Sequence, residues 1–281
     1  MQSRSRVILF VAAICVIVTV KHLQQPIPLE SSSSARGAAQ TVQTKKVIED
    51  EDVKDRPSCL RAMDREIPKS QYGTLPKPYV NLGMPKMGST SLQAFFKCGG
   101  FNSSHYECGN EFCADCIHRA VSHGQPPLSS CGSHYDAFVQ LDNGSFFPQI
   151  EYLDEIHREH PNATFLLTFR GMAGWYRSIS HWPPNADVIN PPLVMSNRMK
   201  SANITGLPVG MGRNAGEFTM WFCNHVNNVR QFVKRYPSHG LIELDIEGEG
   251  NGKRLGELFG IRSSCWGHAN KNPGLGGDKK L

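Results

Sequence analysis

The sequence predicts an α/β fold, a doubly wound parallel sheet flanked by helices. Segments typical of strands and of helices alternate along the chain from about residue 76 onward. One strand segment, ATFLLTFR (163–170), is almost continuously apolar, as a parallel strand covered on both faces requires. With 281 residues, of which 40% are hydrophobic, the chain is long enough for one large globular domain with a sizeable core.

The first half of this domain contains two predicted strands and one helix. YVNLGMP (79–85) is a short strand that enters a Gly-containing turn, and STSLQAFFKCG (89–99) has the composition of a helix that closes at glycine. The Cys-rich segment 101–131 is expected to be an irregular insertion. YDAFVQLD (135–142) alternates between apolar and polar residues, which predicts a second strand.

The second half continues the alternation. PQIEYLDEIHREHP (148–161) is predicted as a helix stopped by its final proline, before the apolar strand described above. A Pro-rich region, 182–208, follows and is predicted to be a loop or a short helix near the site. Apolar residues at every third or fourth position then predict an amphipathic helix over 218–236. GLIELDI (240–246) is a further strand and GKRLGELFGI (252–261) a further short helix, and ligands of such sheets bind at the carboxyl ends of the strands.

The N-terminal part has a different composition. Arg4 and Arg6 precede an apolar run, 7–20, which as a helix would span about 21 Å and is short for a bilayer core of about 30 Å. A cleaved signal peptide is therefore an alternative. Because no Ala-x-Ala-like site follows, we favour an uncleaved signal anchor over residues 7–23 after a cytoplasmic tail, 1–6. Residues 24–75 are predicted to be a flexible stem, which leaves 76–281 as the luminal domain.

Sequons and cysteines suit a luminal domain. Sequons of the Asn-x-Ser/Thr type occur at Asn102, Asn143, Asn162 and Asn203. Setting aside Cys15 in the apolar run leaves eight of the nine cysteines, an even number that favours disulfide bonds in an oxidising lumen. Cys113 and Cys116 have the spacing of half a zinc site, but no second such pair follows, so disulfides are favoured over zinc. Eight cysteines allow 105 connectivities, and the sequence does not choose among them.

A phosphate-binding loop with a displaced lysine follows the first strand. A Walker loop has Gly, four residues and Gly, followed by Lys and Ser/Thr, whereas here Gly83 and Gly88 are followed by Ser89 and Thr90, and the lysine is Lys86. The amides at this helix start would converge on one point, where the helix dipole favours an anion. The lysine could stabilise charge on a leaving phosphate. The net charge of +5, spread along the chain, also favours an anionic ligand over a nucleic acid. The fold class is thus a P-loop-type α/β domain.

Two motifs together resemble one family. PKMGSTSL is similar to the 5′-phosphosulfate loop of sulfotransferases that use 3′-phosphoadenosine 5′-phosphosulfate (PAPS). That family has a second motif, a strand ending in Arg with a Ser eight residues on, both binding the 3′-phosphate, and Arg170 and Ser178 have this spacing. The resemblance covers about residues 76–270 and implies PAPS as sulfuryl donor, without a metal. The implied donor-binding residues are Lys86, Gly88, Ser89, Thr90, Ser91, Arg170 and Ser178.

The anchor, stem and sequons resemble those of Golgi type II membrane carbohydrate sulfotransferases. This resemblance implies a Golgi membrane protein that acts on a carbohydrate or other hydroxyl acceptor, with no indication of its oligomeric state. Family members use a Glu, Asp or His near the end of the strand after the first helix as general base, which points to Asp142. The catalytic residues that the resemblance implies are therefore Lys86 and Asp142. The alternative for Asp142 is a turn-forming residue, because LDNGS is also a good turn sequence. The reserve candidates are His134, His181, His105 and Glu107.

Several alternatives stay open at this point. Lys86 could be an exposed loop lysine, and Arg170 a structural ion-pair partner. SSCWGHANKNP falls where relatives have a loop closing over the nucleotide, but it lacks their Arg-Lys-Gly run, so the resemblance assigns no role to Trp266, Asn270 or Lys271. A nucleotide kinase or NTPase is disfavoured by the missing Walker lysine and by the absence of an evident strand ending in a Mg²⁺-binding Asp. A non-catalytic luminal binding protein is the third possibility.

Overall fold

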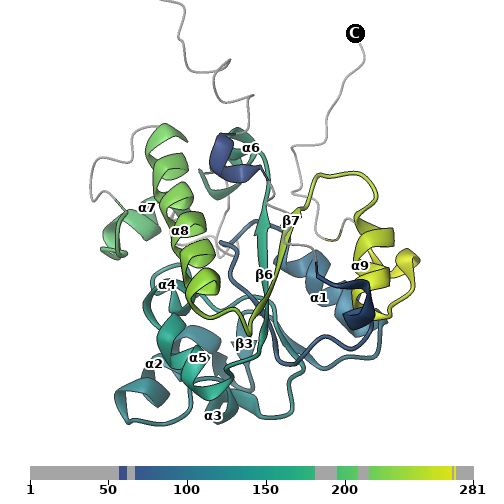
Figure 1. The fold of residues 1–281 in the computed structure, drawn as a ribbon. Helices are drawn as coiled ribbons and strands as arrows, with labels where there is room; N and C mark the ends of the chain where they lie inside the picture. The colour runs from purple at the N-terminus through teal and green to yellow at the C-terminus, as the bar shows by residue number, and fades with distance from the viewer. Residues whose placement is uncertain (1–56, 62–66, 181–194, 208–214, 268, 270–281) are drawn as a thin grey trace, which may run out of the picture. The chain divides into compact units, whose positions relative to one another are not determined.

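The computed structural model describes residues 57–61, 67–180, 195–207, 215–267 and 269 (Figure 1). The predicted signal anchor, 7–23, lies outside the described residues, as does the stem up to residue 56. Within the described residues, no helix combines the length and the apolar character needed to cross a membrane.

Among the described residues, the central sheet has five strands, all paired in parallel. They are β1 (Tyr79–Asn81), β2 (Ser103–Ser104), β5 (Ala137–Phe138), β6 (Thr164–Phe169) and β7 (Gly240–Asp245). Their spatial order is β2-β5-β1-β6-β7, which places β1 at the centre. The chain runs from β1 to one edge of the sheet, returns to β5, and then continues on the opposite side of β1 with β6 and β7. The strand order therefore reverses beside β1, where a doubly wound sheet binds its ligands.

Helices cover both faces of the sheet, so the predicted α/β class is confirmed (Figure 1). Alternate residues of each strand point to opposite faces. In β6, Phe165 and Leu167 join the core on the side of α8 (Ala215–Arg235), while Leu166 joins the core on the side of α1 (Ser89–Cys98) and α9 (Asn251–Phe259). The remaining helices are α2 (Cys113–Ser122), α3 (Ser129–Gly132), α4 (Pro148–Glu151), α5 (Leu153–Glu159), α6 (Met172–Ser180) and α7 (Met195–Ser201).

Two predicted elements are shorter than expected. The strand predicted over 135–142 pairs only as β5. On the side of β1, the Val139 carbonyl accepts the side-chain amide of Asn81 (2.9 Å) and no backbone amide of a described residue, while on the side of β2 the Val139 amide still donates to the Ser104 carbonyl (3.3 Å). The helix predicted over 148–161 is interrupted at Tyr152, whose φ of −124° and ψ of 30° are not helical. The Tyr152 hydroxyl contacts His118 Nδ1 of α2 (2.6 Å), and this tertiary contact accompanies the break.

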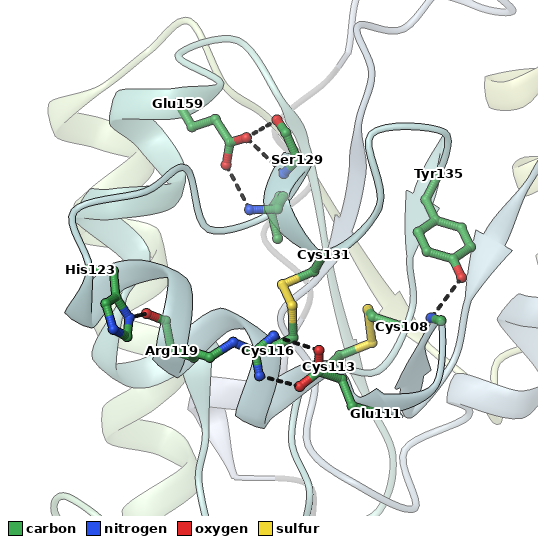
Figure 2. The surroundings of a disulfide bond; sticks show 12 residues. Cys108, Glu111, Cys113, Cys116, Arg119, His123, Ser129, Cys131, Tyr135 and Glu159 are labelled. Carbon is green, nitrogen blue, oxygen red and sulfur yellow. Dashed lines mark hydrogen bonds and ion pairs between the residues drawn. A yellow bond between two sulfur atoms is a disulfide. The ribbon is translucent and has the colours of Figure 1, made fainter.

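The Cys-rich insertion, 101–131, is ordered, so the prediction of an irregular segment is wrong (Figure 2). A hairpin of β3 (Glu107–Cys108) and β4 (Glu111–Phe112) leads into α2. Disulfides Cys108–Cys113 and Cys116–Cys131 close it, and the Glu159 carboxylate accepts the backbone amides of residues 128 and 129 (2.7 and 2.8 Å). These bonds confirm the disulfide interpretation over a zinc site. No group of three or more potential metal ligands occurs in the described part of the chain.

Two further disulfides attach the flanking segments. Cys59–Cys223 ties the 3-10 helix η1 (Ser58–Leu60) to α8, and Leu60 is buried in the core. A second 3-10 helix, η2 (Lys69–Gln71), also precedes β1. Packed structure therefore begins before residue 76, the boundary expected from the sequence. Cys98–Cys265 ties the end of α1 to η3 (Ser263–Cys265).

Candidate active site

The loop between β1 and α1 packs so closely that it needs its two glycines. A Cβ at Gly83 would lie 1.9 Å from Thr168 Oγ1, which is far too close for any side chain. Gly88 has φ +87°, and a Cβ there would lie 2.8 Å from Ile246 Cγ2. The backbone thus passes directly over the ends of β6 and β7, a close approach that only glycine permits.

Four consecutive carbonyls of this loop, at residues 82–85, are held by hydrogen bonds. Their donors are His225 Nε2 (2.8 Å), Gln149 Nε2 (3.3 Å), the Met87 amide (3.2 Å) and Trp175 Nε1 (2.8 Å). Burial lowers the pKa of His225 to about 4, so its imidazole is neutral and Nε2 carries the donated proton. Because the carbonyl oxygens are fixed in these bonds, they are kept from turning toward an anion at the start of α1.

Lys86 lies inside this loop with an unusual backbone conformation. Its φ of +66° is rare for a residue with a Cβ, and such conformations persist where the surroundings enforce them, often at functional sites. The side chain is half-buried, which rules against an exposed loop lysine. Burial, and secondarily the charge of Arg170, lowers the pKa of Lys86 to about 8. The ammonium therefore remains largely charged at pH 7 and lies within electrostatic reach of Arg170.

Hydroxyl groups surround the first turn of α1. Ser89 Oγ donates to Gln140 Oε1 (2.9 Å), and His105 Nε2 lies 3.1 Å from Ser89 Oγ and 3.4 Å from Thr90 Oγ1. Burial, with a smaller effect of a nearby lysine, lowers the pKa of His105 to about 4, so this histidine is a neutral partner of the loop. Ser91 Oγ accepts the amide of Ala269 (3.2 Å), which brings the C-terminal segment to the same helix start.

Arg170 follows β6 directly and is paired with Glu247, which follows β7. Arg170 Nη2 and Nε donate to Glu247 Oε1 at 2.6 and 3.0 Å. The structural ion pair given as an alternative role for Arg170 is thus present. Arg170 also lies close enough to Lys86 to affect its pKa. Ser178 is buried two turns along α6.

Asp142 is the most deeply buried carboxyl group of the site, 1% exposed. Its Oδ2 accepts the Gly144 amide (3.2 Å), so the turn expected from LDNGS exists. Burial raises the pKa of Asp142 to about 7, despite the opposing effect of that amide. Its Oδ1, and Oε1 of the neighbouring Gln149, are buried acceptors without a well-formed hydrogen bond from any described residue, although the side chains of Gln140 and Gln149 lie close enough to Asp142 to oppose the rise of its pKa. Turn formation and proton transfer therefore do not exclude each other for this residue.

The reserve candidates separate by burial. His134 and Glu107 are exposed, and His105 belongs to the hydroxyl cluster already described. His181, Asn270 and Lys271 lie outside the described residues, while Trp266 packs its ring against Phe95 of α1 (centroids 6.1 Å apart).

Sequence reasoning missed three contributors to this edge of the sheet. Glu247 and Gln140 act through long-range contacts that no local pattern reports. Tyr106 has φ +66°, and its phenol has a raised pKa because of burial, with Arg198 opposing and Asp142 adding to the shift. Of these residues only Glu247 had a sequence signal, because it follows the strand predicted over 240–246; Gln140 lay inside the strand predicted over 135–142, and Tyr106 inside the segment expected to be irregular.

The fold is a doubly wound α/β sheet, and Lys86, Asp142, Arg170 and Glu247 all lie just beyond the carboxyl ends of its parallel strands. Residues 80–252, more than half of the chain, match the family described as the sulfotransferase domain. The chain therefore belongs to this sulfotransferase family, as the two motifs indicated. A search among curated proteins found no match.

Proposed function

We propose that the protein transfers the sulfuryl group of PAPS to a hydroxyl group, with a carbohydrate as the expected acceptor. The observation that carries this proposal is the pairing of a preformed anion-binding loop with Lys86 and Arg170, two cations within electrostatic reach of each other. The loop suits a 5′-phosphosulfate, because its glycines let the backbone pass close over the ends of β6 and β7 and its carbonyls are bound elsewhere, so the amides at the start of α1 can face an anion. When bound, the donor supplies a sulfuryl group on a phosphate leaving group.

Each residue has a defined task in this reaction. The amides of residues 88–91 bind the 5′ end of the donor, and Lys86 neutralises the charge that develops on the leaving phosphate oxygen. Arg170 and Ser178 bind the 3′-phosphate, as the family resemblance implies. Asp142 is the candidate base for the acceptor hydroxyl, a role that a carboxyl group with a pKa near 7 suits; because the carboxyl is 1% exposed, the acceptor must displace part of its cover to reach Oδ1.

The proposal places the enzyme in the Golgi membrane as a type II protein. The apolar run at 7–20, with arginines before it, supports a signal anchor, and the four disulfides support an oxidising lumen. Three of the four sequon asparagines, Asn102, Asn162 and Asn203, are exposed, as glycan carriers in the lumen would be.

The test uses the purified full-length protein with labelled PAPS and a panel of glycans. Lys86→Ala and Arg170→Ala should abolish transfer, whereas Lys234→Ala, an exposed lysine on α8, should leave it unchanged. Absence of transfer to every acceptor, combined with no binding of 3′-phosphoadenosine 5′-phosphate, would contradict the proposal. Binding of that nucleotide without transfer would instead identify a non-catalytic binding protein, and magnesium-dependent ATP turnover would indicate a kinase or NTPase.

A further inference from the structure

The ion pair between Arg170 and Glu247 has an asymmetric geometry. One carboxylate oxygen, Oε1, accepts from both Nη2 (2.6 Å) and Nε (3.0 Å) of Arg170. The other oxygen, Oε2, accepts the amide of Gly171 (3.1 Å). The carboxylate therefore binds one edge of the guanidinium and, at the same time, the backbone just before α6.

The surrounding backbone fixes this carboxylate in place. The Glu247 amide donates to Asp245 Oδ1 (3.1 Å), at the end of β7, and β6 and β7 lie side by side along their whole length (Figure 1). Two glycines border the pair. A Cβ at Gly171 would lie 3.4 Å from Glu247 Oε2, and one at Gly174 would lie 3.5 Å from Arg170 Nη2. The two residues bordering the ion pair on the side of α6, Gly171 and Gly174, therefore have no side chains there.

Stability alone is a weak reason for this arrangement. The side chains of Arg170 and Glu247 are 24% and 36% exposed, and ion pairs of this kind contribute about 0–1 kcal/mol to folding. Orientation is a stronger reason. A guanidinium has two edges that can each bind an oxyanion, and Glu247 takes the edge formed by Nε and Nη2. The edge formed by Nη1 and Nη2 then has a fixed direction.

We propose that Glu247 is a positioning residue for the donor, holding Arg170 so that its Nη1–Nη2 edge binds the 3′-phosphate. This inference rests on the proposed function and adds a residue that the family motifs do not contain. It predicts that Glu247 affects recognition of the 3′-phosphate specifically and not nucleotide binding in general. The competing idea, that Glu247 occupies the place of the phosphate and must be displaced, predicts the opposite effect on affinity.

The experiment measures two dissociation constants by calorimetry on the full-length protein. The probes are 3′-phosphoadenosine 5′-phosphate and adenosine 5′-phosphate, which lacks the 3′-phosphate. Glu247→Gln should weaken binding of the first by roughly three- to tenfold and change binding of the second by less than about twofold. Glu249→Gln, an exposed carboxylate in the same loop, is the matched control and should change neither.

A double-mutant cycle with Arg170→Ala separates positioning from a general structural effect. If Glu247 acts through Arg170, Glu247→Gln should have no further effect on 3′-phosphate recognition once Arg170 is removed. Unchanged or tighter binding of 3′-phosphoadenosine 5′-phosphate by Glu247→Gln would overturn the proposal, as would an equal loss for both nucleotides. If the wild-type protein binds neither nucleotide, the proposed function fails as well. If it binds both and Glu247→Gln matches the wild type, only the role of Glu247 fails.

Discussion

Replacing Asp142 by asparagine should stabilise the protein near neutral pH while removing its activity. The carboxyl group is 1% exposed, and burial raises its pKa from 3.8 to about 7. Asparagine has nearly the same shape and retains an oxygen for the Gly144 amide, so the turn is preserved. What changes is the ability to ionise, which the folded protein resists and the reaction needs.

The magnitude follows from the pKa difference. A rise from 3.8 to about 7 is about three pKa units, or on the order of 4 kcal/mol at about 1.36 kcal/mol per unit. Between these pKa values the native state binds one proton more than the unfolded state, so wild-type stability falls as the pH rises. The contribution is fully present below about pH 4 and lost above about pH 7. The side-chain amide of the Asp142→Asn variant does not titrate. The stability of the variant relative to the wild type should therefore increase as the pH rises from about 4 to about 7.

The assay is denaturant unfolding of both proteins at pH 5 and pH 8, together with pH profiles of kcat/KM. The stability difference between Asp142→Asn and wild type should grow with pH, and wild-type kcat/KM should rise through about pH 7 as the carboxylate forms. The variant should be inactive at every pH. A stability difference that does not depend on pH would refute the buried titration. Retained activity would refute the role of Asp142 as the base.

Three other outcomes are expected. Gly88→Ala should weaken nucleotide binding more than about tenfold and lower the free energy of unfolding by about 1–3 kcal/mol, because φ is +87° and the new Cβ would clash with Ile246. The control is Gly100→Ala, where φ is +81° but the space is open, so the loss of stability should be smaller and binding should be unchanged. Affinity for 3′-phosphoadenosine 5′-phosphate should fall as the pH rises through about 8, where Lys86 loses its proton, and calorimetry with Lys86→Arg should show this decline removed. Peptide mass mapping of protein from a secretory host should find no glycan on Asn143, because its side chain is buried and donates to Asp115 (2.8 Å); occupancy there would contradict the packing.

The parts of the fold that follow from periodic burial were predictable. The apolar strand at 163–170 matches β6 because both of its faces are covered, and the helix at 218–236 matches α8 because one wide face packs on the sheet. Lys86 and Arg170 were found by spacing within strand-to-helix turns, and the structure brings their charges near each other. Local sequence sufficed here because each of these two residues follows a strand that could be recognised from its own apolar pattern.

Features that depend on distant partners were not predictable. Pairing of the strand at 135–142 with β1 ends where the side-chain amide of Asn81, far away in sequence, binds the Val139 carbonyl. The burial that raises the pKa of Asp142 comes from packing around the turn, which LDNGS alone does not encode. Glu247 reaches Arg170 only because β6 and β7 are neighbours. In each case the sequence contains the residue, while the contact that defines its role arises from the sheet order.

Burial is the common cause behind the acid–base properties of the site. It raises the pKa of Asp142 to about 7 and lowers that of Lys86 to about 8, so both groups titrate near neutrality from opposite directions. The proposed reaction needs an ionised Asp142 and a protonated Lys86, and both conditions hold together only in a narrow range around pH 7 to 8. The pH dependence of kcat/KM should therefore be bell-shaped. A donor phosphate bound beside Lys86 would raise the pKa of the ammonium, so in the pH profile of kcat the alkaline limb should shift upward. A fixed alkaline limb would place Lys86 away from the bound phosphate.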